Sequence, residues 1–168
     1  MGNEYMQLPK IITLDEYGGN ISTYLEAIYA VFKADFVDSK PTFQGIRLGL
    51  KKHPIIEGKE YTFYHFTHDG DVETERLPNL RRLERIPYPR PMIDNSRHPY
   101  LKVWRNQRGK NSRILIFHEG EGYLVVLDDR GDYILPWTAY LVEFKSRREK
   151  LINEYEAWLK MQKSPGNT

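Results

Sequence analysis

Apolar side chains recur at helical spacing in two segments, one near each end of the chain. Residues 22–36, STYLEAIYAVFKADF, and residues 146–162, SRREKLINEYEAWLKMQ, each carry aromatic and aliphatic side chains three and four positions apart. In both segments a Thr or Ser is followed three residues later by Glu, the spacing of a capping box: Thr23 with Glu26, and Ser146 with Glu149. The pattern predicts one helix near the N-terminus and one that closes the chain.

Between these segments the chain consists of short apolar or alternating runs, bounded by Gly, Asn and Asp. Two early runs, 43–50 and 60–68, predict strands. Residues 79–87 predict a short helix, followed by an ordered loop or a short helical turn over 88–99. In the last third, four runs predict an antiparallel meander: 100–106, 112–118, 123–129 and 133–144. A curved antiparallel sheet of about four to six strands is therefore expected.

The order of these elements predicts an α+β fold: an N-terminal helix, an antiparallel sheet ending in a meander, and a closing helix. A length of 168 residues favours one domain. Within it, residues 1–75 would form the N-terminal helix and strands, residues 76–163 the basic segment, meander and final helix, and residues 164–168 a disordered tail.

Composition limits the chemistry and the compartment. The chain has no cysteine, which rules out disulfides, thiol catalysis and thiolate metal sites. The first ten residues, MGNEYMQLPK, lack the apolar run of a signal peptide, and no apolar stretch is long enough for a membrane span. A cytoplasmic protein without membrane contact is expected.

Charge is concentrated in one segment, although the net charge is only +2. Residues 76–113 contain eleven Lys or Arg, nine of them Arg, and two acids, so this window carries +9 and the remainder −7. Tyrosine and tryptophan lie among these arginines. A basic segment with interleaved aromatics favours contact with a nucleic acid.

A hydroxyl pair lies on the apolar final strand, ILPWTAYLVEF. By strand alternation Thr138 and Tyr140 share one face, while Leu135, Trp137 and Ala139 form the other, more apolar face. Thr138 and Tyr140 therefore point together, away from the predicted core, as the floor of a phosphate site would. Pro136 removes one ladder donor and predicts an edge or bulged position.

Two kinds of metal chemistry can be considered. His65 and His68 lie three apart on a predicted strand and would point to opposite faces, so no metal site is expected there. Glu143-x-Lys145, with Asp128 and Asp129 on the preceding strand, resembles the carboxylate and lysine core of the PD-(D/E)xK nucleases, which implies a magnesium-dependent DNA nuclease as an alternative.

Metal-free cleavage of RNA fits the residue types better. RNA carries its own nucleophile, the 2′-hydroxyl, so the enzyme supplies an acid, a base and cations around the phosphate. His65 is a candidate base. Further candidates for holding phosphates or stacking on bases come from four segments: Arg81, Arg82, Arg85, Lys102, Trp104, Arg113, Thr138 and Tyr140.

Residues 80–158 resemble the barnase–EndoU–colicin–RelE (BECR) group of small ribonuclease domains, most closely their phage-associated and mobile-element-associated members. The likeness rests on RLERIPYPRPMIDN, on LKVWRNQRGKNSRILIFHEGEGYLVVLDDRGDYILPWTAY with its Thr-Ala-Tyr triplet, and on the closing helix. The N-terminal part is longer than in a minimal member of the group.

The resemblance implies a metal-independent endoribonuclease without a cofactor, often a toxin, that acts on tRNA or other cellular RNA and leaves a 2′,3′-cyclic phosphate. It implies catalytic positions at Arg85, Arg113 and Thr138, to which the reading above adds His65. An antitoxin or immunity protein would be a partner. The remaining alternative is a non-catalytic nucleic-acid-binding protein of a phage or mobile element.

Overall fold

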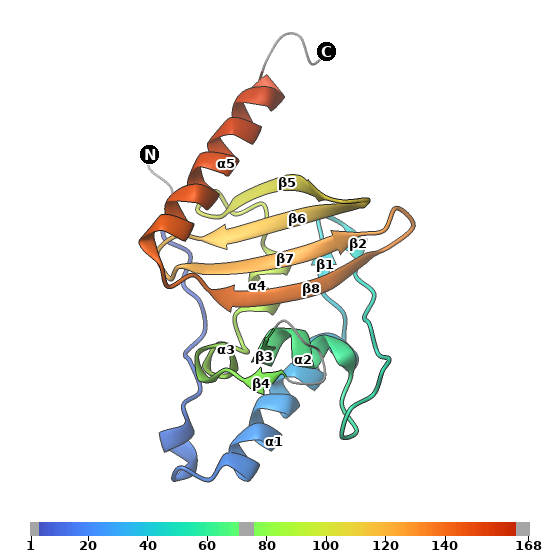
Figure 1. Ribbon diagram of the computed structural model, residues 1–168, viewed down its shortest axis with the longest axis vertical. Coiled ribbons are helices and arrows are strands. Elements are labelled where there is room, and N and C mark those ends of the chain that lie inside the picture. The colour runs from blue at the N-terminus through green and yellow to red at the C-terminus, as the bar shows by residue number, and fades with distance from the viewer. Residues whose placement is uncertain (1–3, 71–75, 164–168) are drawn as a thin grey trace.

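A four-stranded antiparallel sheet forms the centre of the molecule in the computed structural model, which describes residues 4–70 and 76–163 (Figure 1). The strands follow one another in space as they do in sequence, which confirms the predicted meander. Their bounds are β5 Lys102–Arg108, β6 Asn111–His118, β7 Tyr123–Asp129 and β8 Ile134–Leu141. The α+β class is confirmed, with helices at both ends of the chain.

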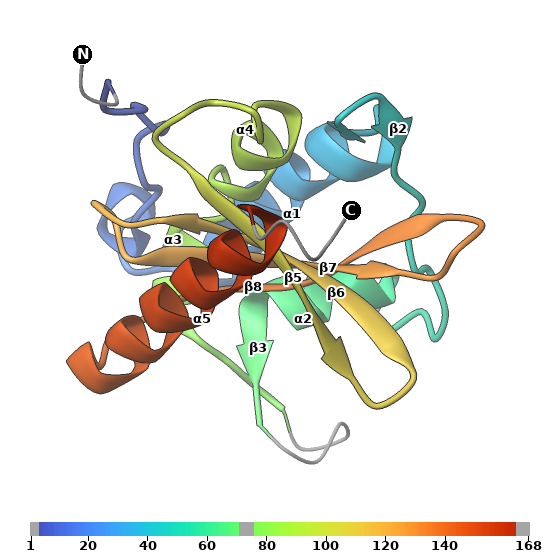
Figure 2. The ribbon, with the colours of Figure 1, turned by 90° about the horizontal axis from the view of Figure 1, so that it is seen from above.

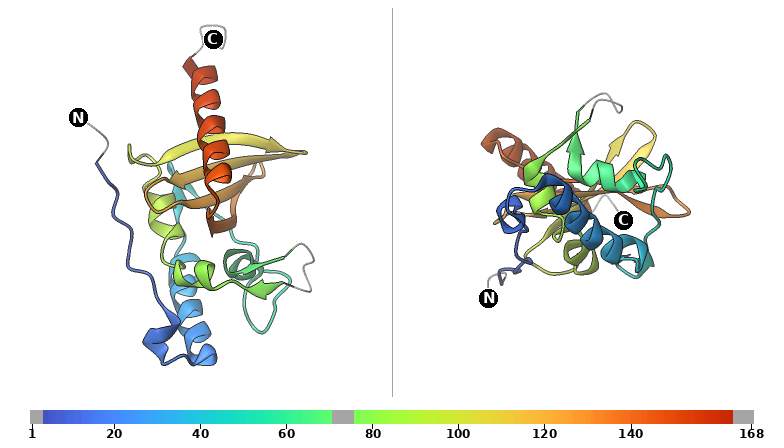
Figure 3. Two further views of the ribbon diagram at one scale, coloured as in Figure 1. Left: turned by 60° about the vertical axis from the view of Figure 1, so that its left-hand side comes forward. Right: turned by 90° about the horizontal axis from the view of Figure 1, so that it is seen from below.

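The N-terminal segment runs extended along the molecule into a short 3₁₀ turn, η1 Leu14–Tyr17, before α1 Ile21–Phe32 and the π-turn η2 Lys33–Val37 (Figure 3). Asn20 caps α1, since its side chain accepts the Thr23 N–H at 3.0 Å. The capping box predicted at Thr23 is therefore wrong. Its proposed partner, Glu26, instead pairs with Lys59 at 3.2 Å.

The run 60–68 is mainly a helix, α2 Tyr61–Thr67, and not the predicted strand. Six of its seven residues are buried, because α2 lies between α1 and the edge strand β8. Its Phe63 packs edge-on against Phe32 of α1 at 5.3 Å between ring centroids. A short segment that is apolar on every side carries no periodicity, so sequence alone does not distinguish a buried helix from a strand.

Three further predictions concern short elements. Residues 43–50 form only a small hairpin, β1 Thr42–Phe43 with β2 Ile46–Arg47, outside the main sheet. The predicted helix within 79–87 is confirmed as α3 Leu80–Glu84, and the segment after it contains α4 Pro89–Asp94. A second small ladder joins β3 His68–Asp69 to β4 Leu77–Pro78, next to α3.

The two faces of the sheet are covered differently. The inner face, with Ile114, Ile116 and Val125, belongs to the large core shared with α1 to α4. The outer face, with Leu115, Phe117, Leu124 and Val126, packs against the closing helix α5 Lys145–Lys163. Figures 1 and 2 show that α5 crosses the outer face at one end of the sheet and leaves the other end uncovered. No helix in the described ranges is both long and apolar enough to cross a bilayer.

A β-bulge in β8 changes which side chains share a face. Val126 pairs with Thr138, but the next residue of β7 pairs with Pro136, so Trp137 is the extra residue. Thr138 and Tyr140 therefore lie on the outer face, whereas Pro136 lies on the inner one. The predicted alternation through the whole segment is wrong, although Thr138 and Tyr140 do point together. Of the edge or bulged position predicted for Pro136, the edge position is confirmed, since β8 is an edge strand, and the bulge lies at the next residue, Trp137.

Candidate nucleic-acid interface around Tyr140

Three adjoining hollows, of about 220, 300 and 340 Å³, meet at Tyr140 on the outer face beside edge strand β8, the side of the sheet away from the contact of α5 with β5. We call them together the Tyr140 cradle. Their described walls come from α2, β3, α3, β5, β6, β7, β8, α5 and the segments next to them, and contain six arginines and two carboxylates: Arg76, Arg81, Arg82, Arg108, Arg113, Arg147, Asp69 and Glu143. The cradle therefore has an excess of positive charge at a place where the molecule is concave.

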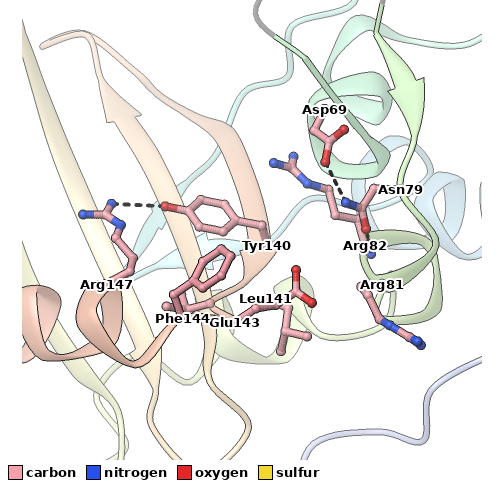
Figure 4. A pocket seen from close by; sticks show the side chains of 10 residues that line it. Asp69, Asn79, Arg81, Arg82, Tyr140, Leu141, Glu143, Phe144 and Arg147 are labelled. Carbon is pink, nitrogen blue, oxygen red and sulfur yellow. Dashed lines mark hydrogen bonds between the residues drawn. The ribbon is translucent and has the colours of Figure 1, made fainter.

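Tyr140 is held between two arginines. Arg147, in the first turn of α5, donates from Nη2 to the phenolic oxygen at 3.2 Å. On the other side, the Arg82 guanidinium lies 5.3 Å from the ring centroid, within the range of a cation–π contact. Figure 4 shows Arg147 reaching the hydroxyl from one side, and Arg82 with Asn79 and Asp69 on the opposite side. The phenol is thus fixed in a strongly cationic setting.

Arg82 and Thr138 close the last turn of α2. A carbonyl in the last turn of a helix has no intrahelical partner. Here the His65 carbonyl accepts from Thr138 Oγ1 at 2.9 Å and from Arg82 Nη1 at 2.9 Å, and Arg82 Nη1 also reaches Thr138 Oγ1 at 3.3 Å. Burial lowers the pKa of Arg82. The Thr138 hydroxyl, predicted as a site group, therefore also joins the sheet edge to α2.

Arg113 lies over an aromatic ring in the wall of the cradle. Its guanidinium carbon is 4.8 Å from the Trp137 ring centroid, and Nε lies 3.4 Å from the fully buried Asp128 without hydrogen-bond geometry. Burial lowers the pKa of Arg113, and the Asp128 carboxylate opposes this effect. The ion pair with Asp128 and the contact with the Trp137 ring hold this guanidinium in the wall of the cradle. A fixed position there is compatible with the phosphate-binding role predicted for Arg113.

His65 lies in the wall between α2 and β8 and is only 6% exposed. Its ring packs against Tyr61 at 4.5 Å and against Trp137 at 4.8 Å, and Nε2 has no hydrogen-bond partner among the described residues. Burial, reinforced by the positive charge of Arg76, lowers the pKa of His65 to about 4. The imidazole is therefore neutral at pH 7 and a weak base, which argues against its predicted role as general base.

Three of the predicted site residues do not line the cradle. Arg85 pairs with Glu84 at 3.2 Å and lines none of the three hollows. Lys102 pairs with Glu119 at 2.9 Å near the covered end of the sheet. Trp104 is 1% exposed beneath α5, where a nucleic-acid base has no access. By contrast Arg81, Arg82, Arg113, Thr138 and Tyr140 all lie in the cradle.

Sequence reasoning missed four arginine or carboxylate positions of the cradle: Arg76, Arg108, Arg147 and Asp69. Arg147 did carry a signal. It lies in the first turn of α5, which has no acidic residue, and a cation there opposes the helix dipole. A residue placed against local preference in this way is a candidate for function.

The carboxylates considered for a magnesium-dependent nuclease do not lie together. Asp128 pairs with Leu135 at the start of β8, whereas Glu143 follows the end of that strand at Leu141. The length of β8, about 20 Å, separates them. The argument that kept His65 and His68 apart is also wrong, since both line one hollow. Among the described residues, no group of three or more His, Asp or Glu side chains is arranged to hold a metal.

Comparisons of this chain with protein-family models, with curated proteins and with solved structures found no match. The resemblance to BECR ribonucleases therefore stays a prediction, carried by the residues quoted above.

Proposed function

We propose that the protein is a metal-independent ribonuclease that binds single-stranded RNA across the Tyr140 cradle. One observation carries this proposal: three hollows from segments far apart in the sequence converge on one tyrosine, with six arginines in their walls. Guanidinium groups match phosphate oxygens in pairs, so several phosphates in succession would find partners there.

The aromatic content of the cradle favours single strands over a duplex. Trp137 and Tyr140 are partly exposed, and each has a guanidinium at its face, that of Arg113 at 4.8 Å and that of Arg82 at 5.3 Å. Base stacking on aromatic and guanidinium planes requires unpaired bases, as in single-stranded RNA. A concave surface of this kind also suits a flexible strand better than the cylinder of a duplex.

One of the three hollows, the one of about 220 Å³, has groups suited to cleavage by the 2′-hydroxyl. Asp69 and Glu143 supply carboxylates, and one of them would take the proton from the 2′-hydroxyl as it attacks phosphorus. The Tyr140 hydroxyl, held by Arg147 at 3.2 Å, would donate a proton to the departing 5′-oxygen. Arg82 and Arg147 would stabilise the charge that develops on the phosphate. The product of this reaction is a 2′,3′-cyclic phosphate.

A second candidate function is RNA binding without cleavage. The low pKa of His65 favours binding without cleavage. His65 is the one histidine in the described walls of the cradle, and its burial lowers its pKa to about 4. A group that titrates near neutral pH, the usual acid or base of metal-independent ribonucleases, is then missing from these walls. The same surface would bind RNA in both cases, so only product formation separates the two functions.

The test is to incubate the protein with total RNA and with plasmid DNA, each in magnesium and in EDTA. Cleavage of RNA in EDTA, with 2′,3′-cyclic phosphate ends and intact DNA, is the expected result. Salt-sensitive RNA binding without any product would favour the binding protein. Cleavage of DNA that stops in EDTA would contradict both functions. Growth arrest on expression is a companion observation for a toxin.

A further inference from the structure

A further hollow of about 470 Å³ adjoins the cradle on its α2 side. We call it the Tyr64 hollow. Its described walls are Ile56, Glu57, Tyr61, Tyr64, His65, His68 and Arg76, of which His65 and Arg76 also line the cradle. A strand bound along the cradle would therefore pass the entrance of this hollow, within reach of one nucleotide.

The rings of the hollow are fixed in place by their neighbours. Tyr64 donates its hydroxyl to the Ile56 carbonyl at 2.8 Å and packs edge-on against His68 at 4.9 Å. Tyr61 packs edge-on against His65 at 4.5 Å. A space bounded by fixed aromatic rings and an aliphatic side chain accommodates a flat, apolar-faced group such as a nucleobase.

Two buried nitrogens in the shared wall have no hydrogen-bond partner among the described residues, His65 Nε2 and Arg76 Nε. A buried polar atom without a partner is costly, so a bound group that supplies acceptors would be favoured here. The exposed carboxylate of Glu57 lines the same hollow. Burial raises the pKa of Tyr64, and the negative charge of Glu57 raises it further. The hollow thus combines the donors of the Arg76 guanidinium and a ring nitrogen of His65 with one carboxylate.

We infer that the Tyr64 hollow binds one unpaired guanine base of an RNA strand lying in the cradle, an inference that rests on the function proposed above. Guanine offers the acceptors O6 and N7 to a guanidinium such as that of Arg76. Its N1–H and amino group are donors that a carboxylate such as Glu57 accepts. Adenine has an amino group in place of O6, which would face the Arg76 donors and leave them unpaired.

The test compares the binding of two fluorescent RNA hexamers, UUUGUU and UUUAUU, with 2′-fluoro sugars that prevent cleavage. The wild-type protein is expected to bind the guanine hexamer about tenfold more tightly, the effect of one bidentate contact to a base edge. Arg76→Met should remove this preference. The matched control is Arg81→Met, because Arg81 lines the cradle but not the Tyr64 hollow and is 56% exposed. It should weaken both hexamers equally and keep the preference.

Glu57→Gln provides a second variant, of nearly the same size, at an exposed turn. It should also reduce the preference for guanine, since a neutral amide replaces the carboxylate acceptor. Equal binding of both hexamers by the wild type, or equal loss of preference in Arg76→Met and Arg81→Met, would overturn the guanine site and leave RNA binding intact. Failure of the wild type to bind either hexamer would instead overturn the proposed function, and the guanine site with it.

Discussion

The outer sheet face has a covered end at strand β5, where α5 packs, and an open end at the opposite edge strand β8, and the two carry similar side chains in different surroundings. At the covered end, Trp104 is 1% exposed and donates its indole N–H to Glu154 of α5 at 3.0 Å. At the open end, Trp137 is partly exposed, and its ring carries the Arg113 guanidinium at 4.8 Å. Both tryptophans lie on strands of one sheet and contribute to the same outer cluster.

The difference between the two ends is the position of α5. This helix buries Leu151 against the sheet near β5, while its first turn, with Arg147, stands at the border of the open end. Where the helix covers the face, aromatics form a core. Where it does not, arginines from several elements gather around Tyr140. The same sheet face thus provides stability at one end and, as we propose, RNA binding at the other.

The largest expected effect separates the two tryptophans. Trp104→Ala should lower the free energy of unfolding by about 3–5 kcal/mol, as expected for deleting a fully buried large aromatic. Trp137→Ala should cost clearly less stability and instead weaken RNA binding, because its ring is partly exposed in the cradle. Urea denaturation and fluorescence anisotropy measure the two effects. Equal stability losses would remove the distinction between the two ends.

Two tyrosines test the chemistry of the open end. Tyr140→Phe should reduce RNA cleavage about 100-fold or more while largely preserving RNA affinity, because it removes a proton donor and not a binding surface. The control is Tyr155→Phe, since Tyr155 belongs to α5, packs against Trp104 at 5.7 Å between ring centroids and does not line the cradle. Single-turnover cleavage rates give the comparison. A Tyr140→Phe variant that cleaves at the wild-type rate would contradict the role of the phenol.

The pH dependence of stability tests the burial of His65 beside the cradle. Its pKa is about 4 in the folded protein and has the ordinary value of 6.5 in the unfolded chain. Between these values the unfolded chain binds more protons, so the free energy of unfolding should fall by about 2–3 kcal/mol as pH drops from 6.5 to 4. His65→Gln should flatten this part of the curve. An unchanged pH profile in that variant would show that His65 is accessible to water.

The smallest expected effect concerns the contact that anchors the open end to α2. Thr138→Val removes the hydroxyl that donates to the His65 carbonyl at 2.9 Å and should cost about 1 kcal/mol of stability. Thr138→Ser keeps the hydroxyl and should retain that bond. Thermal denaturation of both variants measures the difference. A Thr138→Val protein as stable as the wild type would show that Arg82 alone satisfies this carbonyl.

Much of the fold could be predicted from the sequence because the signals were local. The run 123–129 matches β7 at both ends, and the closing helix begins and ends within one residue of its prediction. The strand predicted at 60–68 failed because a segment buried on all sides shows no periodicity. The bulge at Trp137 also has no local signature, and it changed which residues share a face with Thr138.

The candidate site could be predicted in part for a related reason. Residue type and the basic window indicated Arg82, Arg113 and Tyr140, which the fold brings together. The same reasoning selected Arg85 and Trp104, because the sequence does not show that Glu84 pairs with the first or that α5 covers the second. Counting charges along the sequence finds the arginines, but only the tertiary structure shows which of them line the cradle.

The central claim, that RNA phosphates bind at the open end, is tested most directly by a pair of arginines on neighbouring strands. Arg113 and Arg105 each pair with a carboxylate of β7, but only Arg113 lines the cradle. The measurement is the dissociation constant for a single-stranded RNA over a series of salt concentrations. Arg113→Met should weaken binding and reduce the slope of log K against log salt by about 0.7, the loss of one phosphate contact, while Arg105→Met leaves both unchanged. Equal effects of the two substitutions, or no RNA binding at low salt, would contradict the account.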